Sequence, residues 1–368
     1  MKDEKGNMKG WKECKLEDAC VFQRGYDLPK IDMISGIIPV AGSNGIIGYH
    51  NCATTKGPGI TIGRSGNIGT PKFYKTDFWA HNTVLYIKDF KGNDERFIFY
   101  FLQTFDFAAY NAGSAVPTLN RNHIHEIQIL LPPLPEQRAI AAVLSSLDDK
   151  IDLLHRQNKT LEAMAETLFR QWFVEEADAG WAEVPLSSIA TFLNGLACQK
   201  YLPENDIDKL PVLKIRELSN GISADSDWAT DKVDKEYIVE NGDVIFAWSA
   251  SLMVKIWDGE RCILNQHLFK VTSEKNPKWF YLMWCKKHLN EFISIANTHA
   301  TTMGHIKRGD LENAMVLIPG CGKLQKMTAI MEPLLAKQIE NSCQIRTLEK
   351  LRDTLLPKLM SGEVRVYA

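Results

Sequence analysis

The stretch PEQRAIAAVLSSLDDKIDLLHRQNKTLEAMAETLFRQWF, from Pro135 to Phe173, decides how this chain is organised. Its apolar residues recur at alternating steps of four and three, which is the heptad pattern of a helix that packs along another helix. Only the polar Asn158 interrupts the series. At about 1.5 Å per residue the helix would be on the order of 55 to 60 Å long, so one small domain cannot cover it. We therefore expect a partner helix of similar length.

A second stretch, from Gly322 to Met360, repeats the pattern in a weaker form at an offset of 187 residues. We expect the two stretches to pack as an antiparallel coiled coil. Pro333 is expected to kink the second helix or to start it afresh. The polar residues Gln338, Asn341 and Arg352 stand at positions of its seam that would otherwise be apolar. The predicted seam consists of Ile140, Leu144, Leu147, Ile151, Leu154, Leu161, Leu168, Met327, Met331, Leu334, Ile345, Leu348, Leu355 and Leu359.

The sequences that flank the two stretches show that the whole chain is a tandem duplication. Matching segments occur in the same order in both halves, and the offset between them grows from 170 to 187, so the second copy holds 17 extra residues, which we place between Leu202 and Asp234. The matches are Gly10-Trp11 with Gly180-Trp181, Asn82–Leu85 with Asn265–Leu268, and Ile129–Pro132 with Val316–Pro319.

Each globular part has short β-prone runs separated by turn residues, as in Asn44-Gly45 and Gly57-Pro58-Gly59. We expect an α+β fold, in which two α/β domains related by a pseudo-two-fold axis are joined by the two long helices. The predicted boundaries are residues 1–134 for the first domain, 135–174 for the first long helix, 175–320 for the second domain, and 321–368 for the second long helix with its tail.

Composition excludes several classes of protein. The polar N-terminus has no apolar signal core and no apolar run is long enough to span a bilayer, so we expect a cytoplasmic protein with no membrane partner. The eight cysteines form no CxxC pair, which argues against a zinc site and a disulfide framework. A net charge of −2 gives no support to a nucleic-acid partner, but residues 40–87 carry four Lys and Arg against one acid.

The sequence contains no recognisable catalytic constellation. It has no GxxxxGK[ST] phosphate loop, no GxSxG elbow, and no Asn-Pro-Pro-aromatic tetrapeptide of the kind that amino-methyltransferases use. His123 and His125 could lie on one face of a strand, as a metal site might need, but without a carboxylate or cysteine at ligand spacing they are better interpreted as ordinary histidines. We expect no catalytic residue, no metal and no cofactor.

What remains is an inventory made up mainly of Arg, Lys, Asn, Ser and Thr residues in predicted loops, the residue types that contact base edges and phosphates. In the first half the candidate DNA-binding residues are Ser43, Asn44, Arg64, Ser65, Asn67, Lys72, Lys75, Ser114, Thr118, Asn120 and Arg121. In the second half they are Arg216, Trp248, Ser249, Ser251, Lys255, Thr298, His299, Thr301, Thr302, His305, Lys307 and Arg308.

These features together resemble the specificity (S) subunit of type I restriction-modification systems. The segments that carry the resemblance are the Gly-Trp start, GSNGIIGYH, IGRSGNIG, LPPLPEQRAIAAVLSSLDDKID, the duplication and the final TLLPKLMSGEV. It covers essentially the full chain. The resemblance implies that each globular part is a target-recognition domain and that the coiled coil is both a spacer and a docking surface for methyltransferase subunits. Recognition domains diverge fastest in this family, so base-contacting residues are not carried over by motif.

The resemblance also implies that the chain is not catalytic by itself. It would direct adenine methylation, and ATP-dependent cleavage by the restriction subunit, to a split DNA sequence read as two half-sites. The implied partners are double-stranded DNA, two adenine methyltransferase (M) subunits and, through them, restriction (R) subunits. Two alternatives stay open: a degenerate or orphan recognition or scaffold protein without an active partner, and a stand-alone nuclease built on Glu13-Cys14-Lys15.

Overall fold

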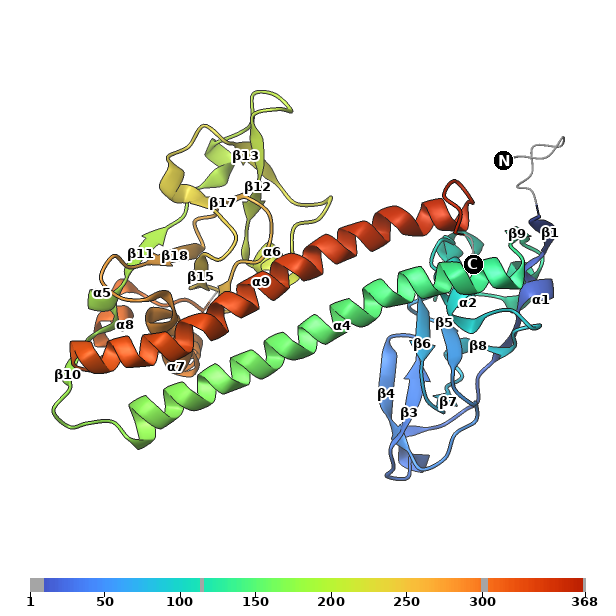
Figure 1. The fold of residues 1–368 in the computed structure, drawn as a ribbon, viewed down its shortest axis with the longest axis horizontal. Helices are drawn as coiled ribbons and strands as arrows, with labels where there is room; N and C mark the ends of the chain where they lie inside the picture. Colours follow the sequence, from blue (N-terminus) through green and yellow to red (C-terminus); the bar gives the residue numbers. More distant parts are fainter. Residues whose placement is uncertain (1–9, 113–115, 299–303, 367–368) are drawn as a thin grey trace. The chain divides into compact units, whose positions relative to one another are not determined.

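The computed structural model describes residues 10–112, 116–298 and 304–366, which divide into two compact units (Figure 1). Unit 1 comprises Met1–Lys150 and Leu348–Ala368, and unit 2 comprises Ile151–Thr347. Each unit therefore holds one globular part and a portion of both long helices, α4 (Leu134–Arg170) and α9 (Cys321–Met360). The first long helix ends in a π-helical turn at Gln171–Glu175.

The strands of unit 1 form a sheet of order β2-β8-β5-β6, a sheet of order β4-β3-β7 and the pair β1-β9. All these pairs are antiparallel except β3 with β7. The bounds are β1 (Lys12–Lys15), α1 (Leu16–Ala19), β2 (Val21–Arg24), β3 (Ile38–Gly42), β4 (Gly45–His50), β5 (Gly59–Gly63), β6 (Pro71–Tyr74), β7 (Trp79–Ala80), β8 (Val84–Asp89), α2 (Glu95–Leu102), α3 (Arg121–His125) and β9 (Gln128–Leu131).

Unit 2 repeats this topology with sheets β11-β18-β15-β16 and β13-β12-β17-β14 and the pair β10-β19, again with one parallel pair, β12 with β17. The extra residues lie where the sequence predicts them: residues 43–44 connect β3 to β4, whereas residues 214–227 connect β12 to β13 and include a helix. The bounds are β10 (Ala182–Pro185), α5 (Leu186–Ile189), β11 (Thr191–Asn194), β12 (Lys209–Leu213), α6 (Ile215–Asn220), β13 (Trp228–Thr230), β14 (Ile238–Val239), β15 (Val244–Ala247), β16 (Met253–Ile256), β17 (Cys262–Leu264), β18 (Leu268–Thr272), α7 (Lys278–Thr298), α8 (Arg308–Asn313) and β19 (Met315–Ile318).

The main core of each unit includes side chains from both long helices. In unit 1, Ile140 and Leu144 of α4 and Leu359 of α9 are buried in the same cluster as Phe97 and Phe101 of α2. In unit 2, Phe169 of α4 and Met331 of α9 lie in one cluster with the aromatic residues of α7. Rings of Phe169 and Trp284 meet edge to face with centroids 5.1 Å apart, a favoured geometry for aromatic pairs. The globular parts therefore pack onto the helices through continuous apolar cores.

The two long helices pack together in antiparallel fashion. Within unit 2, the Asn341 amide nitrogen lies 3.4 Å from the Gln157 Oε1 atom, while Asn158, one residue further along α4, donates to the carbonyl of Gln338, three residues earlier on α9. Every predicted seam residue is buried or half-buried. The prediction that Pro333 starts a new helix is wrong, because α9 runs through it. Pro333 is exposed, so water can satisfy the carbonyl that lacks its helical donor.

Three polar residues that interrupt the seam, Asn158, Gln338 and Asn341, bond to one another. Asn341 is fully buried, and its Nδ2 donates to Asn158 Oδ1 at 3.0 Å. Asn158 in turn donates from its Nδ2 to Ser342 Oγ at 3.1 Å, and Gln338 donates to the Asn158 carbonyl at 3.3 Å. A buried polar layer of this kind favours one register of a coiled coil at some cost in stability.

Charged residues tie the globular part of unit 1 to the helices. The Tyr100 hydroxyl donates to Asp148 Oδ2 at 2.6 Å, and the Arg352 guanidinium donates to the other Asp148 oxygen at 3.0 Å. Burial, followed by the contact with Asp148, raises the pKa of Tyr100, so the phenol stays a donor. Lys75 and Arg96 each lie 3.4 Å from an oxygen of Asp149. The SLDDK segment of the first stretch is thus used for intramolecular anchoring.

A buried ion pair joins the start of α4 to the segment that follows α9 in unit 1. Glu136, in the first turn of α4, is 7% exposed and receives two hydrogen bonds from Arg365, at 2.8 and 2.6 Å, and one from the Trp11 indole at 3.1 Å. The equivalent place in unit 2 has different chemistry, because the Lys323 ammonium lies over the Trp181 ring, 4.7 Å from its centroid.

No helix in the described part of the chain combines the length and apolar character needed to cross a membrane.

We predict that Arg365→Ala lowers the free energy of unfolding by about 3 kcal/mol, because it leaves the Glu136 carboxylate buried with only the indole as a donor. Urea unfolding followed by circular dichroism measures the change. The double variant Glu136→Gln/Arg365→Met is the control, since removal of both charges costs less than removal of one. An Arg365→Ala protein with the wild-type urea midpoint would contradict the prediction.

Candidate nucleic-acid interface

In unit 1 the predicted turn residues converge at one end of the sheets. Ser43 and Asn44 form the turn between β3 and β4, and the Ser43 amide donates to the Thr83 hydroxyl at 3.3 Å. Arg64 follows β5, and its amide donates to the Thr83 carbonyl at 2.8 Å. Ser65 pairs with Thr118 in an isolated antiparallel bridge. Segments far apart in the sequence therefore meet around Thr83.

Unit 2 assembles the same arrangement from its own residues. Trp248 follows β15 as Arg64 follows β5, and Ser249 pairs with His305 as Ser65 pairs with Thr118. The backbone hydrogen bonds also correspond. The Ile306 amide donates to the Trp248 carbonyl at 3.1 Å, and the Leu119 amide donates to the Arg64 carbonyl at 2.8 Å. The two sites are thus equivalent in backbone and different in side chains.

The residue after each of these serines adopts a left-handed backbone conformation. Gly66 has φ +81° and its amide donates to the Pro117 carbonyl at 3.1 Å, while Ala250 has φ +55° and its amide donates to the Gly304 carbonyl at 2.8 Å. This conformation is strained for alanine. The surrounding hydrogen bonds hold Ala250 in the shape that glycine adopts freely in unit 1.

Arg64 is the half-buried cation of the unit 1 site. Its Nε donates to the Asn82 carbonyl at 3.1 Å, which fixes the start of the guanidinium group. Burial, and then the nearby Arg24, lower the pKa of Arg64. Arg24 is itself 3.1 Å from Asp27. The site therefore holds two guanidinium groups and one carboxylate, an arrangement suited to an anionic or hydrogen-bonding ligand.

Unit 2 offers an aromatic and imidazole surface at the same place. The Trp248 indole is stacked near Phe269, with centroids 5.7 Å apart, and its Nε1 donates to Asn194 Oδ1 at 3.1 Å. The buried Ser249 hydroxyl lies 3.2 Å from His267 Nδ1. Trp248 is only half-buried, so part of its ring remains accessible.

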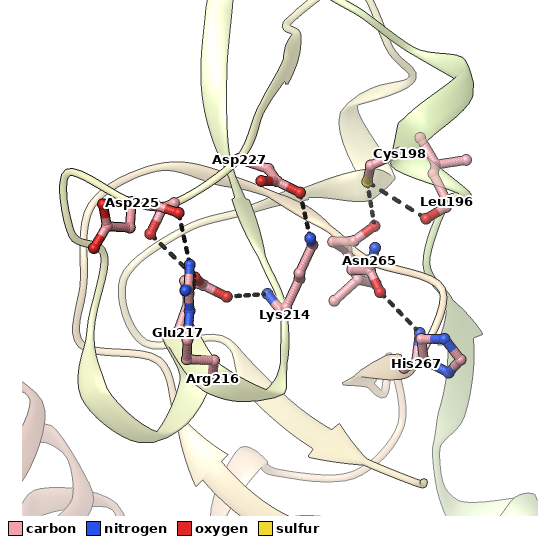
Figure 2. Close-up of polar contacts among 11 residues, drawn as sticks. Leu196, Cys198, Lys214, Arg216, Glu217, Asp225, Asp227, Asn265 and His267 are labelled. Carbon is pink, nitrogen blue, oxygen red and sulfur yellow. Dashed lines mark hydrogen bonds and ion pairs between the residues drawn. The ribbon is translucent and has the colours of Figure 1, made fainter. Parts of the chain in front are cut away.

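A neighbouring cluster in unit 2 neutralises its own charges (Figure 2). Glu217 is 1% exposed and accepts hydrogen bonds from the Arg216 guanidinium at 2.9 and 2.6 Å and from Ser226 at 3.1 Å. Arg216 also donates to the Asp225 carbonyl at 2.8 Å, and Lys214 is ion-paired with Asp227. Arg216 is exposed, but its guanidinium is held by this cluster.

Several predicted cations are likewise used inside the protein. Lys75 is paired with Asp149 on α4. Lys255, on β16, donates to the carbonyls of Leu218 and Ser219 at 3.1 and 3.4 Å. These contacts, and those of Arg216, leave the three side chains less available to an external ligand than their exposure suggests.

The remaining predicted residues lie on the surface near these loops or outside the described residues. Exposed are Asn67, Lys72, Asn120, Arg121, Ser251, Thr298, Lys307 and Arg308, while Thr118 and His305 are half-buried. Ser114, His299, Thr301 and Thr302 lie outside the described residues. Asn120 caps α3 by accepting from the Asn122 amide at 3.0 Å, which gives it a structural role as well.

Sequence reasoning missed Arg24 and the turn formed by His81, Asn82 and Thr83. The signal was available for the turn, because Asn82 begins one of the matching segments of the duplication and Asn265 begins its counterpart. The structure shifts this match by one residue. The amides of His81 and Asn265 donate to the equivalent carbonyls of Ala41 and Leu213 at 3.0 and 3.1 Å, so the structural counterpart of Asn265 is His81 rather than Asn82.

The histidines considered for a metal site have another role. His123 and His125 lie on α3 rather than on a strand, and His125 Nε2 accepts a hydrogen bond from the Phe22 amide at 2.9 Å. Among the residues that the structure describes, no three His, Cys, Asp or Glu side chains are placed to share a metal ion. Lys15, from the nuclease alternative, is paired with Glu126 at 2.7 Å.

The chain is similar in sequence to known proteins. Residues 8–163 and 178–350 match the type I restriction modification DNA specificity domain family. The MjaIX specificity subunit of Methanocaldococcus jannaschii is 29% identical over 308 residues, which cover 75% of this chain and 70% of the relative. The MjaVIII specificity subunit of the same organism is 26% identical over 318 residues, 74% and 71% of the two chains.

A similar fold is found in a solved structure. The crystal structure of the S subunit of a type I restriction-modification system from M. genitalium superposes with a TM-score of 0.67 at 15% identity, covering 95% of this chain and 96% of that chain. At this level of identity the likeness concerns the fold alone.

We predict that Ala250→Gly raises the free energy of unfolding by about 1 kcal/mol, because glycine adopts the left-handed conformation without strain. The matched reverse change, Gly66→Ala, should lower it by a similar amount; a Cβ at Gly66 would meet no atom within 4 Å, so the effect isolates the backbone. Thermal unfolding of both variants measures the two changes in the free energy of unfolding. Destabilisation by Ala250→Gly would show that the loop is not strained.

Proposed function

We propose, from the premise that this chain belongs to the type I restriction-modification DNA specificity family, that its two units each read one half of a split DNA target. Family membership establishes that the chain is a non-catalytic specificity subunit that recognises DNA targets within the complex. The division of the target between the two units, the partner subunits and the contacting residues are the finer part of the proposal.

One observation carries the proposal. The loops around Ser65 and Thr118 in unit 1 and around Ser249 and His305 in unit 2 are held by the same backbone hydrogen bonds but present different side chains. A backbone arrangement shared by both units, with different side chains in each, suits the recognition of two different sequences. Loops held by such backbone hydrogen bonds also suit recognition, since ordering a loop on binding would cost affinity.

The side chains at the two sites differ in the contacts that they can make with bases. The guanidinium of Arg64 can donate two hydrogen bonds to guanine O6 and N7, the commonest specific contact in the major groove. Trp248 and His267 offer an aromatic face and an imidazole, which suit a thymine methyl group and a donor or acceptor edge. We therefore expect the half-site read by unit 1 to contain a guanine that depends on Arg64.

We further propose that the long helices dock two adenine methyltransferase subunits, through which restriction subunits join. Both helices carry partly exposed apolar side chains outside the predicted seam: Leu153, Met164, Ile330 and Leu351 are between 39% and 49% exposed. Exposed leucine and methionine on a helix surface suit a partner helix that lays its apolar face along them.

The test is a genome-wide map of N6-methyladenine in a methylation-free host that expresses this chain with the adenine methyltransferase encoded beside it. A split motif with a fixed gap, present only when both genes are expressed, is the expected result. Absence of new methylation, with a methyltransferase shown to work with another specificity subunit, would favour an orphan protein. Cleavage by the purified chain with magnesium alone would favour a nuclease.

We predict that Arg64→Ala weakens binding to one half-site by about 1 to 3 kcal/mol and leaves the other half-site unchanged. Competition assays with duplexes altered in one half-site at a time measure this. Arg64→Lys keeps the charge but loses the planar fork, so it serves as the control for base reading. Equal loss on random DNA would identify Arg64 as a phosphate contact instead.

Insertion of seven helical residues after Arg156 of α4 and seven after Cys343 of α9 should lengthen the unread gap of the target. One added heptad in each helix adds about 10 Å, which corresponds to about three base-pair steps. These positions lie opposite each other in the antiparallel pair, so the seam stays in register. A methylation map with an unchanged gap would mean that the helices do not set the spacing.

A further inference from the structure

A cavity in unit 2 becomes evident when the two units are compared position by position. In unit 1, Tyr100, Asp148 and Arg352 form the bonded network that joins α2, α4 and α9. The offset of 187 between the helices places Leu335 at the position of Asp148 and Ala165 at that of Arg352. Alignment of the aromatic helices α2 and α7 places Leu282 at the position of Tyr100.

These replacements leave a space that unit 1 fills. Leu335, Ala165 and Leu282 all line a cavity of about 360 Å³ in unit 2. Its floor is completed by Trp279, Met283 and Met331, which belong to the main core of this unit. An alanine in place of an arginine removes a long side chain from the seam of the two helices. The cavity volume falls within the range of small-ligand and side-chain pockets.

The rim of the cavity is charged and slightly basic. It carries Lys159, Lys255 and Lys286 against Glu162 and Asp258, with His155 also present. Lys286 is ion-paired with Glu162 and lies 3.8 Å from Glu166, so the Glu162 carboxylate is already neutralised. Lys159 is exposed at the edge of the apolar floor. Lys286 is thus paired and Lys255 donates to backbone carbonyls, so a carboxylate of an occupant would meet Lys159.

We propose that this cavity receives an aromatic side chain that lies beside a carboxylate on a segment of a partner protein. The aromatic ring would occupy the place that the Tyr100 phenol takes in unit 1, over the floor formed by Trp279 and Met331, and the carboxylate would meet Lys159 at the rim. The assignment of a partner protein rests on the proposed function, since a specificity subunit acts within a complex. In the described part of unit 1 the equivalent space is filled, so the two units would hold the partner unequally.

The chemistry of the site can be tested without the partner. The probes are indole-3-acetate and tryptamine, which share the ring and differ in charge, added to the full chain labelled with 13C at its methionine methyl groups. We expect indole-3-acetate to shift the Met283 and Met331 resonances and to bind at least fivefold more tightly than tryptamine. Absence of shifts, or equal binding of the two probes, would overturn the proposal.

Two variants of one helix separate the cavity from the helix surface. Ala165→Leu fills the cavity, whereas Ala163→Leu adds the same side chain at an exposed position that does not line it. We expect Ala165→Leu to abolish the shifts and Ala163→Leu to keep them. Shifts that persist in Ala165→Leu would overturn the proposal. The triple variant Ala165→Arg/Leu282→Tyr/Leu335→Asp, which copies the network of unit 1, should also abolish them.

The same variants decide the role of the cavity in assembly. Titration calorimetry with the neighbouring methyltransferase subunit should show at least tenfold weaker binding for Ala165→Leu and wild-type binding for Ala163→Leu. Equal affinity of the two variants would overturn the partner assignment. Failure of the wild-type chain to bind that subunit would instead contradict the proposed function. The probe experiment would still decide whether the cavity is a binding site.

Discussion

The packing of two long helices into both cores is the constraint on which the rest of the structure depends. Leu144 and Leu359 are buried with the aromatic residues of α2 in unit 1, and Phe169 and Met327 with those of α7 in unit 2. Each such side chain contributes about 1.5 to 3 kcal/mol when it leaves water. The main core of each globular part is therefore completed by the helices, and a recognition domain cannot be detached from them without exposing that core.

Polar contacts along the helices add specificity to this apolar packing. The layer formed by Asn158, Gln338, Asn341 and Ser342 makes its hydrogen bonds only when these side chains lie opposite one another. The bonds from Tyr100 and Arg352 to Asp148 likewise fix the orientation of α2 against the helices of unit 1. Such contacts contribute little net stability compared with apolar residues, but they select one arrangement among several that bury similar area.

Much of this fold could be predicted from the sequence, because heptad periodicity and duplicated turn segments are local signals. Whether a surface cation is available depends on partners far away in the sequence: Lys75 meets Asp149 and Lys255 meets the end of α6. Those contacts arise only from tertiary packing, and so does the convergence of Arg24 and Thr83 on Arg64. The new helix start predicted at Pro333 is wrong, since α9 continues through this exposed residue, where water can bond the carbonyl that loses its helical donor.

The tryptophan that begins each half has a consequence for evolutionary exchange. Trp11 offers its N–H edge to a carboxylate, Glu136, whereas Trp181 offers its ring face to an ammonium group, Lys323. An indole can satisfy either charge, because its edge is a donor and its face attracts cations. A recombination event that moves a globular part, with its own tryptophan, from one helix junction to the other thus retains a partner for that residue. The two junctions thus carry opposite charges, yet each offers a favourable contact to a tryptophan at that place.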